Sequence, residues 1–199
     1  MKKLLLLSFF CALFINAQAQ KPFTFGPMIG AGFNTSHFSG TGAEGYKSKA
    51  NGNFLGGAFA RISIKRVYIQ PELYYSSKIS NFTYPYSGSA KNQIKTGNVN
   101  INALVGVKLL KLSGLFNLRV FAGPSTSLIV ANGYYYNGTK EGTANLKSSS
   151  FNVQAGLGVD ISKLTIDFRY EQGLNNISNA YNTNLKINSV FVTLGFKIL

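Results

Sequence analysis

A strict two-residue alternation between Phe151 and Tyr170 constrains the fold of this chain more than any other feature of its sequence. One set of alternate positions is apolar, from Val153 through Ile166 and Phe168, and the other set carries glycines, amides and charges. Successive side chains of a β-strand point to opposite faces, so the pattern predicts a hairpin with one apolar and one polar face. The rest of the chain decides which of the two faces points inward.

The same alternation predicts eight strands, joined by connections that are alternately long and short. The expected strands are 23–34, 53–64, 67–76, 98–109, 115–130, 151–161, 164–171 and 189–198. Four long polar loops are expected at 35–52, 77–97, 131–149 and 173–186, and three tight turns at 65–66, 111–114 and 162–163. Transmembrane barrels have an even number of strands, short turns at one end and longer loops at the other. The sequence therefore predicts an all-β fold, an eight-stranded antiparallel up-and-down transmembrane β-barrel.

The first nineteen residues have the features of a signal peptide. Lys2 and Lys3 precede an apolar run at 4–15, and Ala17-Gln18-Ala19 forms a small-residue cleavage site. The apolar run is shorter than the roughly 20 residues that a membrane-spanning helix needs. Residues 20–199 are expected to form the outer-membrane barrel domain. The single cysteine, Cys11, lies in the signal segment, which excludes a disulfide framework from the expected barrel.

The placement of charged residues decides between two barrel designs. A soluble carrier barrel turns its apolar face inward around a ligand, whereas a membrane barrel turns that face toward lipid. The charges fall on the glycine-rich polar faces, and glycine suits the crowded interior of a small barrel. Buried charges are costly unless they are paired, so we expect a network of ion pairs that fills the lumen; an ion path or a catalytic carboxylate pair is the alternative. The predicted lumen residues are Arg61, Glu72, Lys108, Arg119, Asp160, Asp167, Arg169, Glu171 and Lys197.

The strongly basic composition indicates which partners the protein meets. The formal net charge of +14 becomes +12 without Lys2 and Lys3, because 18 basic and 6 acidic residues remain. Behind an export signal, the expected counter-charges are the phosphates of outer-membrane lipid or lipopolysaccharide rather than nucleic acid. We expect a monomer in the cell outer membrane that contacts this lipid, the barrel assembly machinery and a protein partner. Tyr135, Tyr136 and Tyr181 are candidates for a binding surface on the long loops, with an aromatic girdle as the alternative for the tyrosines at strand ends.

The sequence contains no recognisable catalytic, cofactor or metal motif. His37 is the only histidine and stands between Ser36 and Ser39 in an expected loop, but the nucleophile motif G-x-S-x-G is absent. One histidine without a cysteine in the barrel also argues against a zinc site. We therefore expect a protein of structural or interaction type that is not an enzyme and has no cofactor. A small lipid-modifying enzyme that uses His37 is the alternative.

Four stretches resemble a known family: PELYYS, AGP, GLGVDISKLTIDFRYEQGLNNI and the closing FVTLGFKI. The chain resembles the PorT-like outer-membrane β-barrel proteins of the Bacteroidetes along nearly all of residues 20–199, and RYEQGLNNI is the most specific part. The resemblance implies an eight-stranded outer-membrane barrel, and one family namesake takes part in protein secretion and gliding. Outer-membrane barrels usually end on an aromatic residue, whereas this sequence ends on Ile198-Leu199, with Phe196 the nearest aromatic residue.

Overall fold

The chain folds into a closed antiparallel β-barrel in the computed structural model, which describes residues 23–39, 47–83, 92–112, 116–144, 146–178 and 184–198. No helix among these residues is long and apolar enough to cross a membrane. The predicted signal peptide, Cys11 and Tyr181 lie outside the described residues. The eight barrel strands are β1 (Phe23–Ser39), β3 (Asn51–Ile64), β4 (Val67–Thr83), β5 (Asn92–Leu112), β6 (Phe116–Tyr136), β8 (Ser149–Ile161), β9 (Leu164–Gly173) and β10 (Asn184–Phe196).

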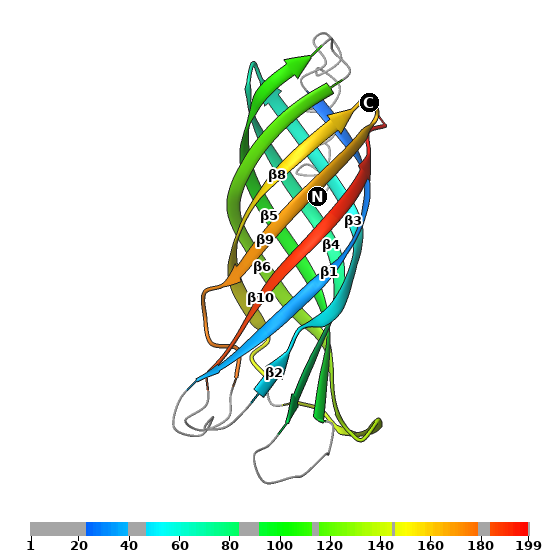
Figure 1. The fold of residues 1–199 in the computed structure, drawn as a ribbon, viewed down its shortest axis with the longest axis vertical. Coiled ribbons are helices and arrows are strands. Elements are labelled where there is room, and N and C mark those ends of the chain that lie inside the picture. Colours follow the sequence, from blue (N-terminus) through cyan, green and yellow to red (C-terminus); the bar gives the residue numbers. More distant parts are fainter. Residues whose placement is uncertain are drawn as a thin grey trace, which may run out of the picture.

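Each barrel strand pairs with its neighbours in the chain, and β1 closes the barrel by pairing with both β3 and β10 (Figure 1). The connections β3–β4, β5–β6 and β8–β9 lie at one end, at the top of Figure 1, and we call this the turn end. The longer connections lie at the opposite loop end. Two short strands extend the sheet there: β2 (Lys47–Lys49) pairs with β4, and β7 (Thr139–Gly142) pairs with β6. This arrangement confirms the predicted eight-stranded up-and-down barrel.

The strands reach further toward the loop end than the alternation predicts. The predicted loop boundaries are wrong, because 35–39, 77–83, 92–97, 131–136 and 184–186 belong to strands. Backbone pairing continues there, as Lys95 lies opposite both Ile79 and Gly133. Where the strands extend beyond the lipid, neither of their faces needs to be apolar. The two-residue alternation therefore fades there, although the backbone hydrogen bonds between strands continue. A register shift between Gly97 and Asn98 also interrupts the period between β5 and β6.

The apolar face of the barrel points outward. Ile166 and Phe168 are 40% and 55% exposed, whereas Asp167 and Arg169, which alternate with them, are each 1% exposed. The same contrast holds around the barrel: large apolar side chains such as Phe54 are exposed on the outside, and polar side chains are buried within. Such a surface is stable only in contact with lipid. The carrier-like alternative, with an apolar lumen, is therefore wrong.

Two small apolar clusters lie inside the barrel beside the polar side chains. One contains Met28, Leu55, Phe59, Tyr74 and Phe191, and it packs β1, β3, β4 and β10 together. The other contains Tyr68, Leu104 and Phe121, from β4, β5 and β6. The lumen is thus filled by aromatic and aliphatic side chains as well as by charged ones. This agrees with the narrow interior expected of eight strands.

Candidate functional site

The turn-side half of the lumen contains a concentration of charged side chains. They come from β3, β4, β6, β8 and β9, and all of them point inward because they occupy the same set of alternate positions on their strands. Each is at most 3% exposed: Arg61, Glu72, Arg119, Asp160, Asp167, Arg169 and Glu171. These are seven of the nine residues that the sequence assigns to the lumen.

The first half of this network runs from β3 to β9. Arg61 Nη1 lies 2.8 Å from Asp160 Oδ2, and Arg119 Nε lies 3.1 Å from Asp160 Oδ1. Arg119 also donates through Nη2 to Asp167 Oδ1. Asp160 therefore joins two arginines, and Arg119 joins two carboxylates. The signs of charge alternate along the series, so no like charges are direct partners.

The second half returns from β9 to β3. Arg169 Nη2 lies 2.7 Å from Asp167 Oδ2, and both Nη atoms of Arg169 donate to the carboxylate of Glu72, at 2.6 and 2.8 Å. Gln70 completes the circuit: its Nε2 donates to Glu72 Oε1 at 2.6 Å, and its Oε1 accepts from Arg61 Nε at 2.6 Å. The result is a closed ring of seven side chains, which we call the lumen ring: Arg61, Asp160, Arg119, Asp167, Arg169, Glu72 and Gln70.

A second layer of polar contacts lies on the loop side of the lumen ring. Lys78 Nζ lies 2.6 Å from Glu171 Oε1, and Gln154 Nε2 donates to Glu171 Oε2 at 2.7 Å. Asn102 Nδ2 links the layers, since it donates to Glu72 Oε2 at 2.9 Å and to Gln154 Oε1 at 3.2 Å. Three arginines and Lys78 thus face four carboxylates. Equal numbers of opposite charges lower the cost of burying them.

Aromatic rings separate the arginines from one another. The Arg61 guanidinium carbon lies 5.1 Å from the centre of the Tyr68 ring, and that of Arg119 lies 5.7 Å from it. On the other side, Phe121 is 5.7 Å from Arg119 and 5.3 Å from Arg169. Guanidinium groups gain cation–π stabilisation in such positions. The rings also occupy the space between the ion pairs, so that the network is packed as well as charge-balanced.

One glycine makes room for the lumen ring. A Cβ at Gly158 would lie 2.5 Å from Asp167 Oδ1 and 2.6 Å from Arg119 Cζ, closer than any side chain tolerates. The Arg119–Asp167 pair therefore occupies the volume that a side chain on β8 would fill. This close approach explains why the polar face of the hairpin contains glycine at this position.

The other two predicted lumen residues lie nearer the turn end. Lys108 is partly buried and donates through Nζ to Ser63 Oγ at 3.0 Å. Lys197 follows β10, is partly exposed, and its backbone N–H donates to the carbonyl oxygen of Lys163 at 2.7 Å. Neither belongs to the lumen ring. The sequence interpretation also missed Lys78, because it placed residue 78 in a loop; one further step of the alternation beyond Ser76 would have placed it on the inward face.

The residues proposed for chemistry or binding at the loop end are strand residues. His37 lies in β1 opposite Lys186 and is exposed, whereas Ser36 points inward and its Oγ lies 2.8 Å from Ser80 Oγ. His37 and Ser36 thus lie on opposite faces of the sheet and cannot act together. Tyr135 and Tyr136 lie in β6, so their assignment to a loop is wrong. Among the described residues, no three His, Cys, Asp or Glu side chains could hold a metal ion.

An apolar outer surface around a charged and packed lumen defines an integral membrane β-barrel. The chain belongs to the family described as outer membrane protein beta-barrel domain, whose model matches residues 16–179. The protein is therefore located in the cell outer membrane, as the sequence predicts. The match ends before β10, the strand that closes the barrel against β1.

Several solved structures of outer-membrane proteins are similar to this chain. The outer membrane protein OprG from Pseudomonas aeruginosa is 11% identical, with 88% of this chain and 93% of that chain covered and a TM-score of 0.54. Neisserial surface protein A is 12% identical, with 86% and 97% covered and a TM-score of 0.45. The attachment invasion locus protein Ail of Yersinia pestis is 15% identical, with 87% and 99% covered and a TM-score of 0.40. At 11% identity, the likeness to OprG shows the fold alone. No curated protein sequence matches the chain significantly.

Proposed function

We propose that this protein is a non-catalytic, monomeric outer-membrane barrel whose lumen is closed to ions and whose loop end contacts surface glycolipid or a protein partner. The lumen ring carries the first part of the proposal. Its seven side chains connect five strands across the barrel, and aromatic rings fill the gaps between them. An ion that crossed the lumen would have to displace several buried, charge-assisted hydrogen bonds, which are among the strongest in proteins.

The geometry supports a structural rather than a catalytic use of the buried carboxylates. Each of Glu72, Asp160 and Asp167 accepts hydrogen bonds from arginine, and Glu171 pairs with Lys78. A general acid or base must reach a substrate, whereas these groups are buried and already satisfied by partners. His37, the other candidate for chemistry, has the cation Lys186 as its cross-strand neighbour on β10.

Conductance measurements test the closed lumen directly. Purified protein in planar bilayers is expected to show no steady current at 100 mV, whereas a large, steady conductance of the wild type would overturn the proposal. The double substitution Glu72→Ala with Arg169→Ala removes one ion pair from the lumen ring and is expected to introduce brief, small openings. The exposed residue Lys186 provides the matched control, since Lys186→Ala removes a charge outside the lumen and should remain silent.

A second candidate function is membership of a protein secretion machinery, as a PorT-like barrel of the Bacteroidetes. The RYEQGLNNI stretch favours it, because its last residues hold the start of a loop in one conformation. Asn176 Oδ1 accepts from the N–H groups of Ser178 and Leu185, at 2.9 and 2.8 Å, and Asn175 Oδ1 accepts from the N–H of Phe151 at 2.7 Å. A fixed loop is suited to a specific protein partner.

Mild crosslinking in outer membranes, followed by purification, distinguishes the two candidates. A stable set of secretion proteins that is lost with Asn176→Ala supports the second candidate. Recovery of glycolipid without secretion proteins supports the first candidate, and the barrel assembly machinery is then expected only while the barrel is being inserted.

A further inference from the structure

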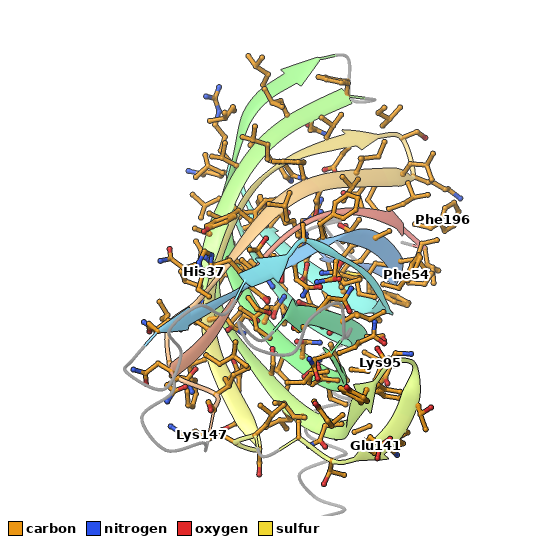
Figure 2. All side chains as sticks on the ribbon, turned by 60° about the horizontal axis from the view of Figure 1, so that its bottom comes forward. His37, Phe54, Lys95, Glu141, Lys147 and Phe196 are labelled. Carbon is orange, nitrogen blue, oxygen red and sulfur yellow. The ribbon has the colours of Figure 1, made fainter. Side chains whose placement is uncertain are left out.

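Two lysines and a tyrosine lie together on the outer face of the loop end, where β5, β6 and β7 are neighbours. Lys95 Nζ of β5 lies 4.5 Å from the centre of the Tyr135 ring, which belongs to β6. Lys140 of β7 is paired with Tyr135 across the next ladder. We call Lys95, Tyr135 and Lys140 the basic cluster. Figure 2, in which the loop end comes forward, shows Lys95 on the side opposite His37 and Lys147.

A glycine allows these side chains to pack. A Cβ on Gly133 would lie 2.9 Å from Tyr135 Cε2 and 3.4 Å from Lys140 Cε, so the tyrosine ring and the lysine stem both lie over this glycine. Lys95 is paired with Gly133 from the other side. The ammonium group of Lys95 thus lies over the Tyr135 ring, and the stem of Lys140 lies beside the same ring. Their positions are set by backbone pairing on both sides of β6.

The positive charges of the basic cluster have no balancing carboxylate within the described residues. None of the ion pairs between described residues includes Lys95 or Lys140. Lys95 and Lys140 are like charges on the two strands that flank β6, and an anion placed between them would reduce their repulsion. Glu141, the residue next to Lys140 in β7, is exposed and weakens the local positive potential without forming such a pair.

The cluster stands at the level where the apolar surface of the barrel ends. Tyr75 of β4 is 50% exposed, and its hydroxyl lies 2.2 Å from where a Cβ on Gly97 would be. A tyrosine in this position marks the interface, with its ring toward the hydrocarbon and its hydroxyl toward the headgroups. Lys95 is the next outward-facing residue of β5 after Gly97, roughly 7 Å further toward the loop end. Lys95 therefore lies at headgroup level.

We propose that Lys95 and Lys140 together bind a phosphate group of the glycolipid in the outer leaflet, with Tyr135 holding the two lysines in place. This inference rests on the proposed function, since it names the site and the chemical group through which the loop end contacts glycolipid. Two ammonium groups provide up to six N–H donors for the phosphate oxygens. The acyl chains of the same glycolipid would lie along exposed apolar side chains such as Val130, which is 59% exposed.

Binding of lipid A to the full chain in detergent micelles tests the site. The double variant Lys95→Ala with Lys140→Ala is expected to raise the Kd for lipid A by at least tenfold, because it removes charge-assisted hydrogen bonds to the phosphate. Wild-type protein is expected to bind dephosphorylated lipid A as weakly as the double variant binds lipid A. Tyr135→Leu, which keeps both charges, is expected to raise the Kd about threefold through loss of the cation–π contact. Glu141→Gln is expected to lower the Kd.

The matched control removes the same charge from the opposite end of the barrel. Arg66 and Lys163 are exposed residues of the tight turns at the turn end, and the double variant Arg66→Ala with Lys163→Ala is expected to leave the Kd within twofold of wild type. Equal losses in the two double variants would show a general charge effect and overturn the proposal. Competition of lipid A by inorganic phosphate at the same concentration would also overturn it, in favour of a site for free phosphate.

The outcome is independent of the test of the closed lumen. A conducting wild-type barrel that still distinguished the two double variants would remove the closed lumen and leave the phosphate site. A barrel without conductance, whose variants all bound lipid A with the same Kd, would support the closed lumen and overturn the phosphate site. Because all six substituted positions lie outside the lumen, circular dichroism in micelles is expected to show native β-structure for every variant.

Discussion

Arg119 shows how a single side chain can hold a membrane barrel together from within. It is fully buried and contacts two carboxylates, Asp160 and Asp167, as well as the hydroxyl of Tyr68. Arg119→Ala would leave two buried carboxylates with one partner fewer each, and breaking a buried pair costs about 3–5 kcal/mol. We expect the free energy of unfolding in lipid vesicles, measured with urea, to fall by about this amount. Arg66→Ala, an exposed arginine in a turn, is expected to change it by less than about 0.5 kcal/mol.

Gly158 provides a second test at the scale of the residue, because even a single methyl group there would contact the Arg119–Asp167 pair of the lumen ring. Gly158→Ala places a methyl group where the Arg119–Asp167 pair lies, and overpacking of this kind typically costs about 1–3 kcal/mol. Gly56 is the matched glycine, since a Cβ there would have nothing within 4 Å. Gly56→Ala is expected to be neutral or slightly stabilising in the same urea titration. Equal destabilisation by the two variants would mean that the close approach at Gly158 has no energetic weight.

At the scale of the element, the sequence correctly predicts the parts of the strands that have lipid on one face. It mistakes for loops the parts of the strands that extend beyond the lipid. Between Leu164 and Tyr170 apolar positions alternate with polar and charged ones, because one face meets lipid and the other meets the lumen ring. The strand, its two faces and its lumen charges therefore all follow from the pattern. Past Ser76 and Val130 the pattern fades, and the sequence therefore predicts loops where β4 and β6 continue. Lys78 was lost from the predicted network for that reason.

The partners within the network are not predictable from one strand at a time. Alternation places Arg61 and Asp160 on inward faces, but which arginine meets which carboxylate depends on the stagger of five strands around the barrel. Gln70, which closes the lumen ring, carries no charge and so gave no signal. The basic cluster is not predictable from the sequence either. Lys95 and Lys140 are brought together by pairing of β5, β6 and β7 beyond the predicted strand ends.

The connection after β9 offers a prediction about one element. Asn176 Oδ1 accepts hydrogen bonds from two backbone N–H groups, those of Ser178 and Leu185, and thereby ties the loop to the start of β10. Asn176→Ala would leave both amides without this acceptor, and local opening exposes such amides to exchange. We expect their hydrogen exchange, followed by mass spectrometry, to accelerate about tenfold, with little change in the centres of β9 and β10. Thr139→Ala, in exposed β7, is expected to leave both amides unchanged.

At the scale of the whole molecule, the apolar outer face of the barrel predicts that the cost of an outward-facing charge depends on its depth in the membrane. Phe168 and Gln172 both point outward from β9, but Phe168 lies opposite Val192 and Leu157 in the middle of the apolar surface, whereas Gln172 lies near the loop end. Lysine on the lipid face costs about 2–4 kcal/mol at the midplane and about 0–1 kcal/mol near an interface. Phe168→Lys is therefore expected to lower the free energy of unfolding in vesicles by about 1–4 kcal/mol more than Gln172→Lys. In a soluble barrel with water outside, both positions would accept lysine with similar ease, and equal effects of the two substitutions would contradict the membrane-facing assignment of this surface.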